Sequence, residues 1–310
     1  MSNVANHLQS GITSTNQAEI SAHIDWISVT YPHAYIRENS GRGVLADDFT
    51  GGFQTVRGTM GYAQARQYES GAIMQWHDRH PSMGVHVTYT AQALHYASEN
   101  FGLSQVEILE TLSEFGRVSR CDMCVDVANV DIDINALYNQ AKSGIVKSRA
   151  KQFSYVENAK SGNEKGARTF YIGSMTKRKK LLRVYDKGMQ LNLDNFLTRF
   201  ELETHGQVAQ TAVKGVIASA ENSADTIRGM INGYADFSNT QVGQYLSSSC
   251  AIKLSHPKYQ KSNTAQWLVD VVAKTLANEV YSSPNLMSEF MDRFKFHIEQ
   301  LQNSERFENE

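Results

Sequence analysis

The sequence has few cysteines and no long apolar segment, which argues against several classes of protein. Its three cysteines among 310 residues, Cys121, Cys124 and Cys250, are too few for a disulfide framework. Residues 1–22 are polar and lack the basic flank and apolar stretch of a secretory signal, and no apolar run reaches transmembrane length. We therefore expect a cytoplasmic protein that does not contact a membrane.

Cys121 and Cys124 have the spacing of half a zinc site. The sequence has no second such pair and no clustered His-x-His to complete the site. In a strand, moreover, the two side chains point to opposite faces. A role as small buried hydrophobes is therefore favoured, with zinc as the alternative.

The pattern of apolar residues predicts a mixed α and β protein. A capping box formed by Ser104 and Glu107 opens a predicted helix that ends at Gly116, and a second helix is expected over 133–141. These signals predict the α+β class, an antiparallel catalytic sheet with flanking helices. Alternating segments predict strands at 23–31, 83–90, 118–128, 151–157, 167–174, 181–187 and 198–205.

The character of the chain changes after Gly206, where three segments have helical periodicity and little strand signal: 207–233, 263–279 and 284–302. We predict a flexible N-terminus (1–22), a β-rich catalytic domain (23–206) and a mainly helical region (207–310) for DNA binding or dimerisation, with a loose boundary within 235–262. A chain of 310 residues is long enough for this division.

Positive charge is concentrated in one part of the chain. Residues 142–187 contain thirteen Lys and Arg and three acidic residues, a net charge of +10. The rest of the chain therefore has a net charge of -12, which gives -2 for the whole sequence. This asymmetry favours a surface that faces a polyanion, above all at Lys177, Arg178, Lys179 and Lys180. A solvated basic loop is the alternative.

Three short strands carry their polar residues on one face: Arg120 to Asp126, Arg183 to Lys187 and Arg199 to Glu203. Clustered carboxylates are costly unless a cation binds among them, which favours a divalent metal beside a phosphate. Carboxylate oxygens suit Mg²⁺ or Mn²⁺. The alternative is pairing within the sheet, of Arg120 and Arg199 with neighbouring acids.

Tyr185 stands between Arg183 and Lys187 on one strand. Nearby positive charge favours the phenolate, so Tyr185 is a candidate nucleophile. A packed aromatic side chain is the alternative. In the segment 50–76, aromatic residues are candidates for stacking on unpaired bases or for the core: Phe53, Tyr62, Tyr68 and Trp76.

Six segments, in this order and spacing, resemble the replication initiation factor family of rolling-circle plasmids, integrative elements and filamentous phages, the Rep-trans type. They are IDWISVT (24–30), GVHVTYT (84–90), SRCDMCVDV (119–127), TFYIGS (169–174), LRVYDKG (182–188) and RFELE (199–203). The resemblance implies that Tyr185 is the nicking nucleophile and that Asp122 and Glu201 bind the metal, with Asp126 as a third ligand. A small glycine turn expected after 84–90 is replaced by Thr90-Ala91-Gln92.

The implied reaction is a nick in single-stranded or extruded origin DNA that leaves a 5′-phosphotyrosine and a 3′-hydroxyl primer and is later reversed. Arg183 and Lys187 would stabilise negative charge at the reaction centre. Implied partners are duplex and single-stranded origin DNA, a host helicase and polymerase, and a second copy of the chain. A conjugative relaxase and a DNA-binding regulator that does not nick are the alternatives. The expected DNA contacts are Lys177, Arg178, Lys179, Lys180, Arg120 and Arg199.

Overall fold

The structure, a computed structural model, describes residues 17–33, 52–158, 166–176 and 179–255, together with residues 288, 291, 292 and 295. The chain divides into two compact units, Met1–His256 and Pro257–Glu310. All helices and strands named below lie in the first unit. The predicted helices at 263–279 and 284–302 fall almost entirely outside the described residues, and a turn expected at 161–163 falls wholly outside them.

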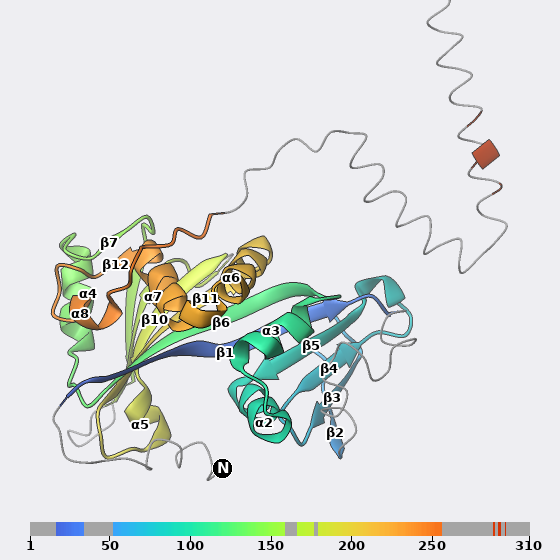
Figure 1. Cartoon of the computed structure of the whole chain (residues 1–310), viewed down its shortest axis with the longest axis horizontal. Coiled ribbons are helices and arrows are strands. Elements are labelled where there is room, and N and C mark those ends of the chain that lie inside the picture. The colour runs from blue at the N-terminus through green and yellow to red at the C-terminus, as the bar shows by residue number, and fades with distance from the viewer. Residues whose placement is uncertain are drawn as a thin grey trace, which may run out of the picture. The chain divides into compact units, whose positions relative to one another are not determined.

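Within the described residues, ten strands form one antiparallel sheet in the order β2-β3-β4-β5-β1-β6-β11-β10-β9-β8 (Figure 1). The two longest strands, β1 and β6, lie side by side at its centre. A separate pair is formed by β7 (Lys147–Ser148) and β12 (Ala235–Asp236). The strands of the large sheet are β1 (Glu19–Tyr31), β2 (Phe53–Val56), β3 (Gln64–Tyr68), β4 (Ile73–Trp76), β5 (Val85–Thr90), β6 (Arg117–Ala128), β8 (Phe153–Asn158), β9 (Ala167–Ile172), β10 (Lys180–Asp186) and β11 (Leu197–His205).

Helices cover one face of the sheet. In Figure 1, α6 and α7 lie over its centre, and both contact β6 and β11. Alternation along each strand explains this arrangement, since residues such as Leu182 and Val184 of β10 are buried toward the helices while Arg183 and Tyr185 face away. The helices are α2 (Ala91–Phe101), α3 (Gln105–Ser113), α4 (Ile134–Lys142), α5 (Lys187–Leu191), α6 (Gln207–Ala218), α7 (Ser223–Tyr234) and α8 (Gly243–Leu246), with 3-10 turns η3 (Pro81–Met83) and η4 (Ala220–Asn222).

These elements confirm the predicted α+β class and most of the predicted strands. The capping box of α3 is present, because Ser104 Oγ accepts from the Glu107 amide while the Glu107 carboxylate accepts from the Ser104 amide at 2.8 Å. The stretch after β5 is no glycine turn, because Thr90 caps the N-terminus of α2. The candidate stacking aromatics Phe53, Tyr68 and Trp76 lie on β2, β3 and β4, and Tyr62 lies just before β3. None of the helices within the described residues is long and apolar enough to cross a membrane.

The chain after Gly206 continues within the first unit. Val208, Ala209 and Val213 of α6 and Ile227 of α7 are buried in the same core as the sheet. Because of this burial, α6 and α7 belong to the same compact unit as the sheet, and that unit ends at His256, within the 235–262 region.

The sheet is built from two halves of similar topology. In the first half, β1 is followed by the meander β2–β5, β5 returns to pair with β1, and α2 and α3 follow. In the second half, β6 is followed by the meander β8–β11, β11 returns to pair with β6, and α6 and α7 follow. Within the described residues, the face opposite these helices therefore continues without a break from the second half onto the first, and we call it the uncovered face.

Candidate active site

Strand register gathers the predicted polar residues on the uncovered face of the second half. On β6 and β11, Glu203 lies opposite Asp122 and Arg199 opposite Asp126. On β10, Arg183 lies opposite Glu201 of β11. Residues directly opposite each other in an antiparallel pair project to the same side, so one surface carries all six side chains.

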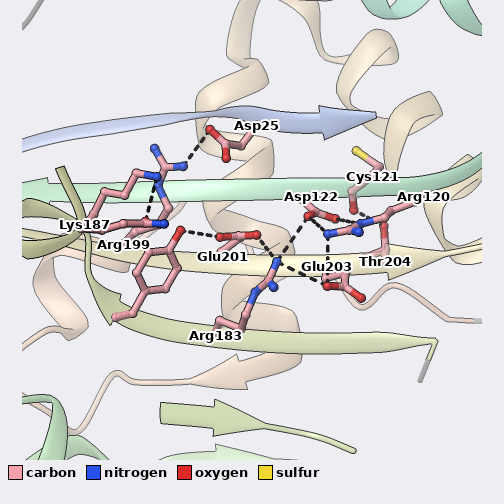
Figure 2. Close-up of polar contacts among 12 residues, drawn as sticks. Asp25, Arg120, Cys121, Asp122, Arg183, Lys187, Arg199, Glu201, Glu203 and Thr204 are labelled. Carbon is pink, nitrogen blue, oxygen red and sulfur yellow. Dashed lines mark hydrogen bonds and ion pairs between the residues drawn. The ribbon is translucent and has the colours of Figure 1, made fainter. Parts of the chain in front are cut away.

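Arg183 lies at the centre of this surface, as Figure 2 shows. Its Nη2 contacts Glu201 Oε1, Asp122 Oδ2 at 3.4 Å and Glu203 Oε2 at 3.3 Å. Arg120 donates to both oxygens of Asp122, at 2.9 and 2.5 Å, and contacts Glu203 at 3.3 Å. Three carboxylates thus share two guanidinium groups, and Glu203 also contacts His205 Nε2 at 2.6 Å.

Burial and the neighbouring charges affect the protonation of Asp122, which is only 2% exposed. Burial raises its pKa, the hydrogen bonds and charge of Arg120 oppose this, and the charges of Glu201 and Glu203 raise it further, so the pKa reaches about 6. A cation bound beside Asp122 would relieve this repulsion.

We expect the metal-free protein to lose stability as the pH rises through the titration of Asp122. A carboxyl group with a higher pKa in the folded than in the unfolded chain binds more protons when folded, so the free energy of unfolding falls with rising pH between the two values. The values here are 3.8 and about 6, and the loss is on the order of 2 kcal/mol. Urea unfolding in a chelating buffer across this range should reveal the slope in the parent protein and its absence in Asp122→Asn. The same slope in both proteins would contradict the assignment to Asp122.

Tyr185 contacts the same cluster through Glu201. Its hydroxyl donates a hydrogen bond to Glu201 Oε2 at 2.7 Å. Burial, and then the negative charge of Glu201, raise the pKa of Tyr185 well above its usual value. The expectation that neighbouring cations favour the phenolate of Tyr185 is therefore contradicted, because burial and the charge of Glu201 outweigh the charge of Arg199.

Lys187 also differs from its expected position. It begins α5 instead of continuing β10, and its Nζ donates to Gln190 at 3.1 Å. The ammonium lies 5.9 Å from the centre of the Tyr185 ring. Lys187 is therefore close to the tyrosine ring but does not lie on the same strand.

A second cluster surrounds Arg199. Its guanidinium donates twice to Asp126, at 2.7 Å each, and contacts Asp25 at 2.7 Å. Burial raises the pKa of Asp25, but the hydrogen bond from His23 and the charges of Arg199 and His23 hold it well below its usual range. The alternative of pairing within the sheet thus describes Arg199 and Asp126 in the metal-free protein.

A β-bulge brings Asp25 to this surface. The pairing of β1 with β6 shifts register between Ile24 and Trp26, which leaves Asp25 as the extra residue and aims its carboxylate at Arg199. The bulge is visible in the sequence only as a break in alternation, because Ile24 and Ile27 are both buried although they are three residues apart. Asp25 and its neighbour His23 were for this reason not predicted as site residues, and Glu203 was placed on the polar strand face without a functional role.

Two groups of side chains are candidate metal ligands. Asp122, Glu201 and Glu203 converge on Arg183 Nη2, so they already bind a cationic group and have the oxygen donors that hard divalent ions prefer. In the other group, ligand atoms of His23, Asp25 and Cys124 lie within 4.8 Å of one another.

The chemistry of the donors favours the carboxylate group. Cys124 is fully buried, and burial raises the pKa of its thiol well above the usual value, so it is a neutral and poor ligand. Cys121 is buried in the core on the opposite side of β6, so the two cysteines do not share one site.

The predicted DNA contacts are only partly gathered at this site. Lys179 is exposed, whereas Lys180 lies on the helix-covered side, where its ammonium donates to the Leu254 carbonyl at 2.7 Å. Arg120 and Arg199 lie at the site but are held by carboxylates. Lys177 and Arg178 fall outside the described residues.

Comparison with known proteins gives three results. A solved structure of a rolling circle replication initiator protein from Geobacillus stearothermophilus has a similar fold, with a TM-score of 0.58 and 20% sequence identity over 71% of this chain and 87% of that one. No curated protein matches the chain significantly. The family model described as replication initiation factor matches residues 116–282, more than half of the chain and all the strands of the second half of the sheet. The chain is therefore a member of the replication initiation factor family.

Proposed function

We propose that this protein initiates rolling-circle replication by nicking one strand of its origin DNA with Tyr185. The observation that carries the proposal is the hydrogen bond from the Tyr185 hydroxyl to Glu201 Oε2, 2.7 Å long, on a sheet face that also holds three arginines. The pairing of a hydroxyl nucleophile with a base, and of that base with a third group, here Arg183, is the arrangement expected of an activated nucleophile.

The step balances within the residues of the site. The phenolic oxygen of Tyr185 attacks the phosphorus atom while its proton passes to Glu201. The new bond joins that oxygen to phosphorus, and the bond from phosphorus to the 3′-oxygen breaks. The 3′-oxygen takes that proton from Glu201 and becomes a 3′-hydroxyl, which returns Glu201 to its carboxylate form, whereas the 5′-phosphate stays on the tyrosine. Because one ester replaces another, the reverse reaction rejoins the strand without a nucleotide cofactor.

Proton transfer to Glu201 explains how a tyrosine of raised pKa can act. Glu201 Oε1 is held by Arg183, which fixes the carboxylate with Oε2 toward Tyr185. Arg183 is itself 25% exposed and can face a phosphate bound above the sheet. Its positive charge would stabilise the charge that develops on the phosphate oxygens, and Lys187 would add to this from the start of α5.

We propose that Mg²⁺ or Mn²⁺ is held by Asp122 and Glu201, with Glu203 as a third ligand in place of Asp126. Asp126 is held through both oxygens by Arg199, whereas Glu203 shares Arg183 with the other two carboxylates. When bound, the ion polarises the phosphodiester as a Lewis acid. Synthesis from the released 3′-hydroxyl would then need a helicase and a polymerase of the host.

The direct test uses purified protein and supercoiled DNA of its own replicon, with Mg²⁺ or Mn²⁺. The expected product is open-circular DNA that carries one protein on a 5′ end. DNA that is bound but never nicked, under either ion, would contradict the proposal and favour the second candidate, a DNA-binding regulator. That candidate is supported by the contacts of Asp122, Asp126, Glu201 and Glu203 with arginines, which a purely structural role would also produce.

The basic segment formed by Lys177, Arg178 and Lys179, which precedes β10, is expected to contact duplex DNA. Reversing the charges of Lys177, Arg178 and Lys179 should weaken origin binding and reduce its salt dependence, since each lost phosphate contact removes about one unit from the log-log slope. Lys180 is left unchanged because its ammonium is engaged by the Leu254 carbonyl. Nicking of a short single strand should suffer less than duplex binding, because that reaction needs only the contacts near Tyr185.

A matched control reverses three exposed cations outside residues 142–187, Arg79, Lys214 and Lys253. Both variants change the net charge by the same amount. If the basic segment is only solvated, origin binding by its charge-reversed variant will show the same salt slope, between low and moderate salt, as binding by the control variant.

A further inference from the structure

The uncovered face of the first half carries a different kind of surface from the active site. The two strands of the first half nearest the active site contribute hydroxyl, imidazole and aromatic side chains, and β4, β5 and residues 26–31 of β1 contain no Asp or Glu. The active-site surface, in contrast, carries five carboxylates: Asp25, Asp122, Asp126, Glu201 and Glu203. A polyanion crossing both halves would meet no acidic side chain from these strands of the first half.

Trp26 marks the start of this surface. It lies opposite Asp122 in the register of β1 and β6, so it directly adjoins the active site. Its indole Nε1 donates to Ser28 Oγ at 2.9 Å, and Ser28 in turn shares a 3.0 Å hydrogen bond with Thr88. The guanidinium of Arg120 lies 4.8 Å from the centre of the indole ring. These polar contacts hold the indole ring in place, half-buried and outside the apolar core.

Tyr62 repeats the arrangement farther along the same face. Its ring stacks on His86 with centres 5.7 Å apart and planes 20° apart. His86 is held in turn by Thr30, through a 3.0 Å contact between Nδ1 and Oγ1. The exposed Arg117 lies opposite Thr30 in the sheet and close enough to influence the charge of Tyr62.

We propose that Trp26, Ser28, Thr30, His86, Thr88 and Tyr62 form a binding strip for the single-stranded DNA that adjoins the nick, with unpaired bases stacked on Trp26 and Tyr62. Aromatic rings paired with cations are the usual means of holding unpaired bases without reading their sequence. Trp26 and Thr30 are four residues apart on β1, a distance of about 13 Å, and Thr30 holds the His86 ring on which Tyr62 stacks. The rings of Trp26 and Tyr62 would therefore hold bases at different points along one DNA strand. The role as a nick-adjacent site rests on the proposed function, whereas stacking itself does not.

The test measures binding of a short oligothymidylate, and of a duplex of similar length, in a Tyr185→Phe background that cannot form a covalent link. Trp26→Ala and Tyr62→Ala should each weaken single-strand binding about 5- to 100-fold, and Trp26→Phe should restore most of the loss at its position. Duplex binding should change less than twofold, because paired bases are not available for stacking. Phe53→Ala is the matched control, since Phe53 is 48% exposed but lies on the other side of the sheet and should leave both unchanged.

A spectroscopic measurement covers the case in which an alanine variant fails to fold. With Trp76→Phe and Trp267→Phe, Trp26 is the sole tryptophan, and its fluorescence should be quenched by oligothymidylate but not by duplex. Unquenched fluorescence, or equal losses for duplex and single strand, would overturn the strip. If the strip behaves as expected while supercoiled origin DNA is never nicked, the proposed function fails and the strip stands. If origin DNA is nicked normally and the Trp26 and Tyr62 variants bind single strands like the parent, the strip fails and the proposed function stands.

Discussion

Tyr185→Phe is expected to abolish nicking and the covalent adduct while leaving the fold and DNA binding nearly intact. The substitution removes only the attacking oxygen, and the ring keeps its place beside Val184 and Asp186 on β10. The hydroxyl makes one hydrogen bond, to Glu201, and Arg183 still pairs with that carboxylate in the variant. Denaturing gel electrophoresis of the protein with labelled origin DNA measures the adduct directly.

Tyr171→Phe on the neighbouring β9 is the matched control. Tyr171 lies opposite Arg183 in the register of β9 and β10, on the same face as Tyr185, but it is not predicted to attack. It should nick like the parent. An adduct that persists in Tyr185→Phe would show that another residue is the nucleophile.

Glu201→Gln is expected to lower the rate of nicking by several orders of magnitude, because it removes both the proton acceptor of Tyr185 and a metal ligand. Asp122→Asn removes a ligand alone and should also lower the rate strongly. At neutral pH its stability should change little or rise, since the variant relieves the repulsion that raises the pKa of Asp122 to about 6. Rates on a short single-stranded substrate, with saturating Mn²⁺, separate the chemical step from origin binding.

Metal binding supplies the independent readout for these two variants. Calorimetry with Mn²⁺ should show weaker binding in Glu201→Gln and Asp122→Asn, but tighter binding in Arg183→Gln, whose guanidinium otherwise occupies the oxygens of Asp122, Glu201 and Glu203. Unaltered Mn²⁺ affinity in both acidic variants would identify the carboxylates as structural partners of arginine. A thiolate-to-metal absorption band with Co²⁺, lost in Cys124→Ser, would instead locate the ion at His23, Asp25 and Cys124.

The alternation of residues determined most of the fold in advance. In β10, for example, Leu182 and Val184 are apolar and Arg183 and Tyr185 polar, and such a period of two can only be satisfied by a strand with one buried face. The capping box of Ser104 and Glu107 likewise specified the start of α3 through local hydrogen bonds. Short-range patterns of this kind need no knowledge of the rest of the chain.

Sequence also predicted that Arg183 and Tyr185 share one face, because alternate residues of a strand stay on the same side whatever the sheet order. It did not predict their states. Whether Tyr185 is deprotonated depends on which carboxylate lies opposite and how deeply both are buried, and these are properties of register and packing. The same holds for Lys187, which the turn into α5 removes from the strand.

The remaining features were decided only by tertiary structure. Asp25 reaches the active site because a bulge in β1 re-aims it, and a bulge depends on pairing with a strand about one hundred residues away. Trp26 and Tyr62 come to one face because β1 and β5 pair and the loop before β3 folds back over His86. Local sequence specifies which side of its own strand a residue occupies, but long-range pairing decides which strands are neighbours, and the charges, protonation and neighbouring surfaces of the site follow from that pairing.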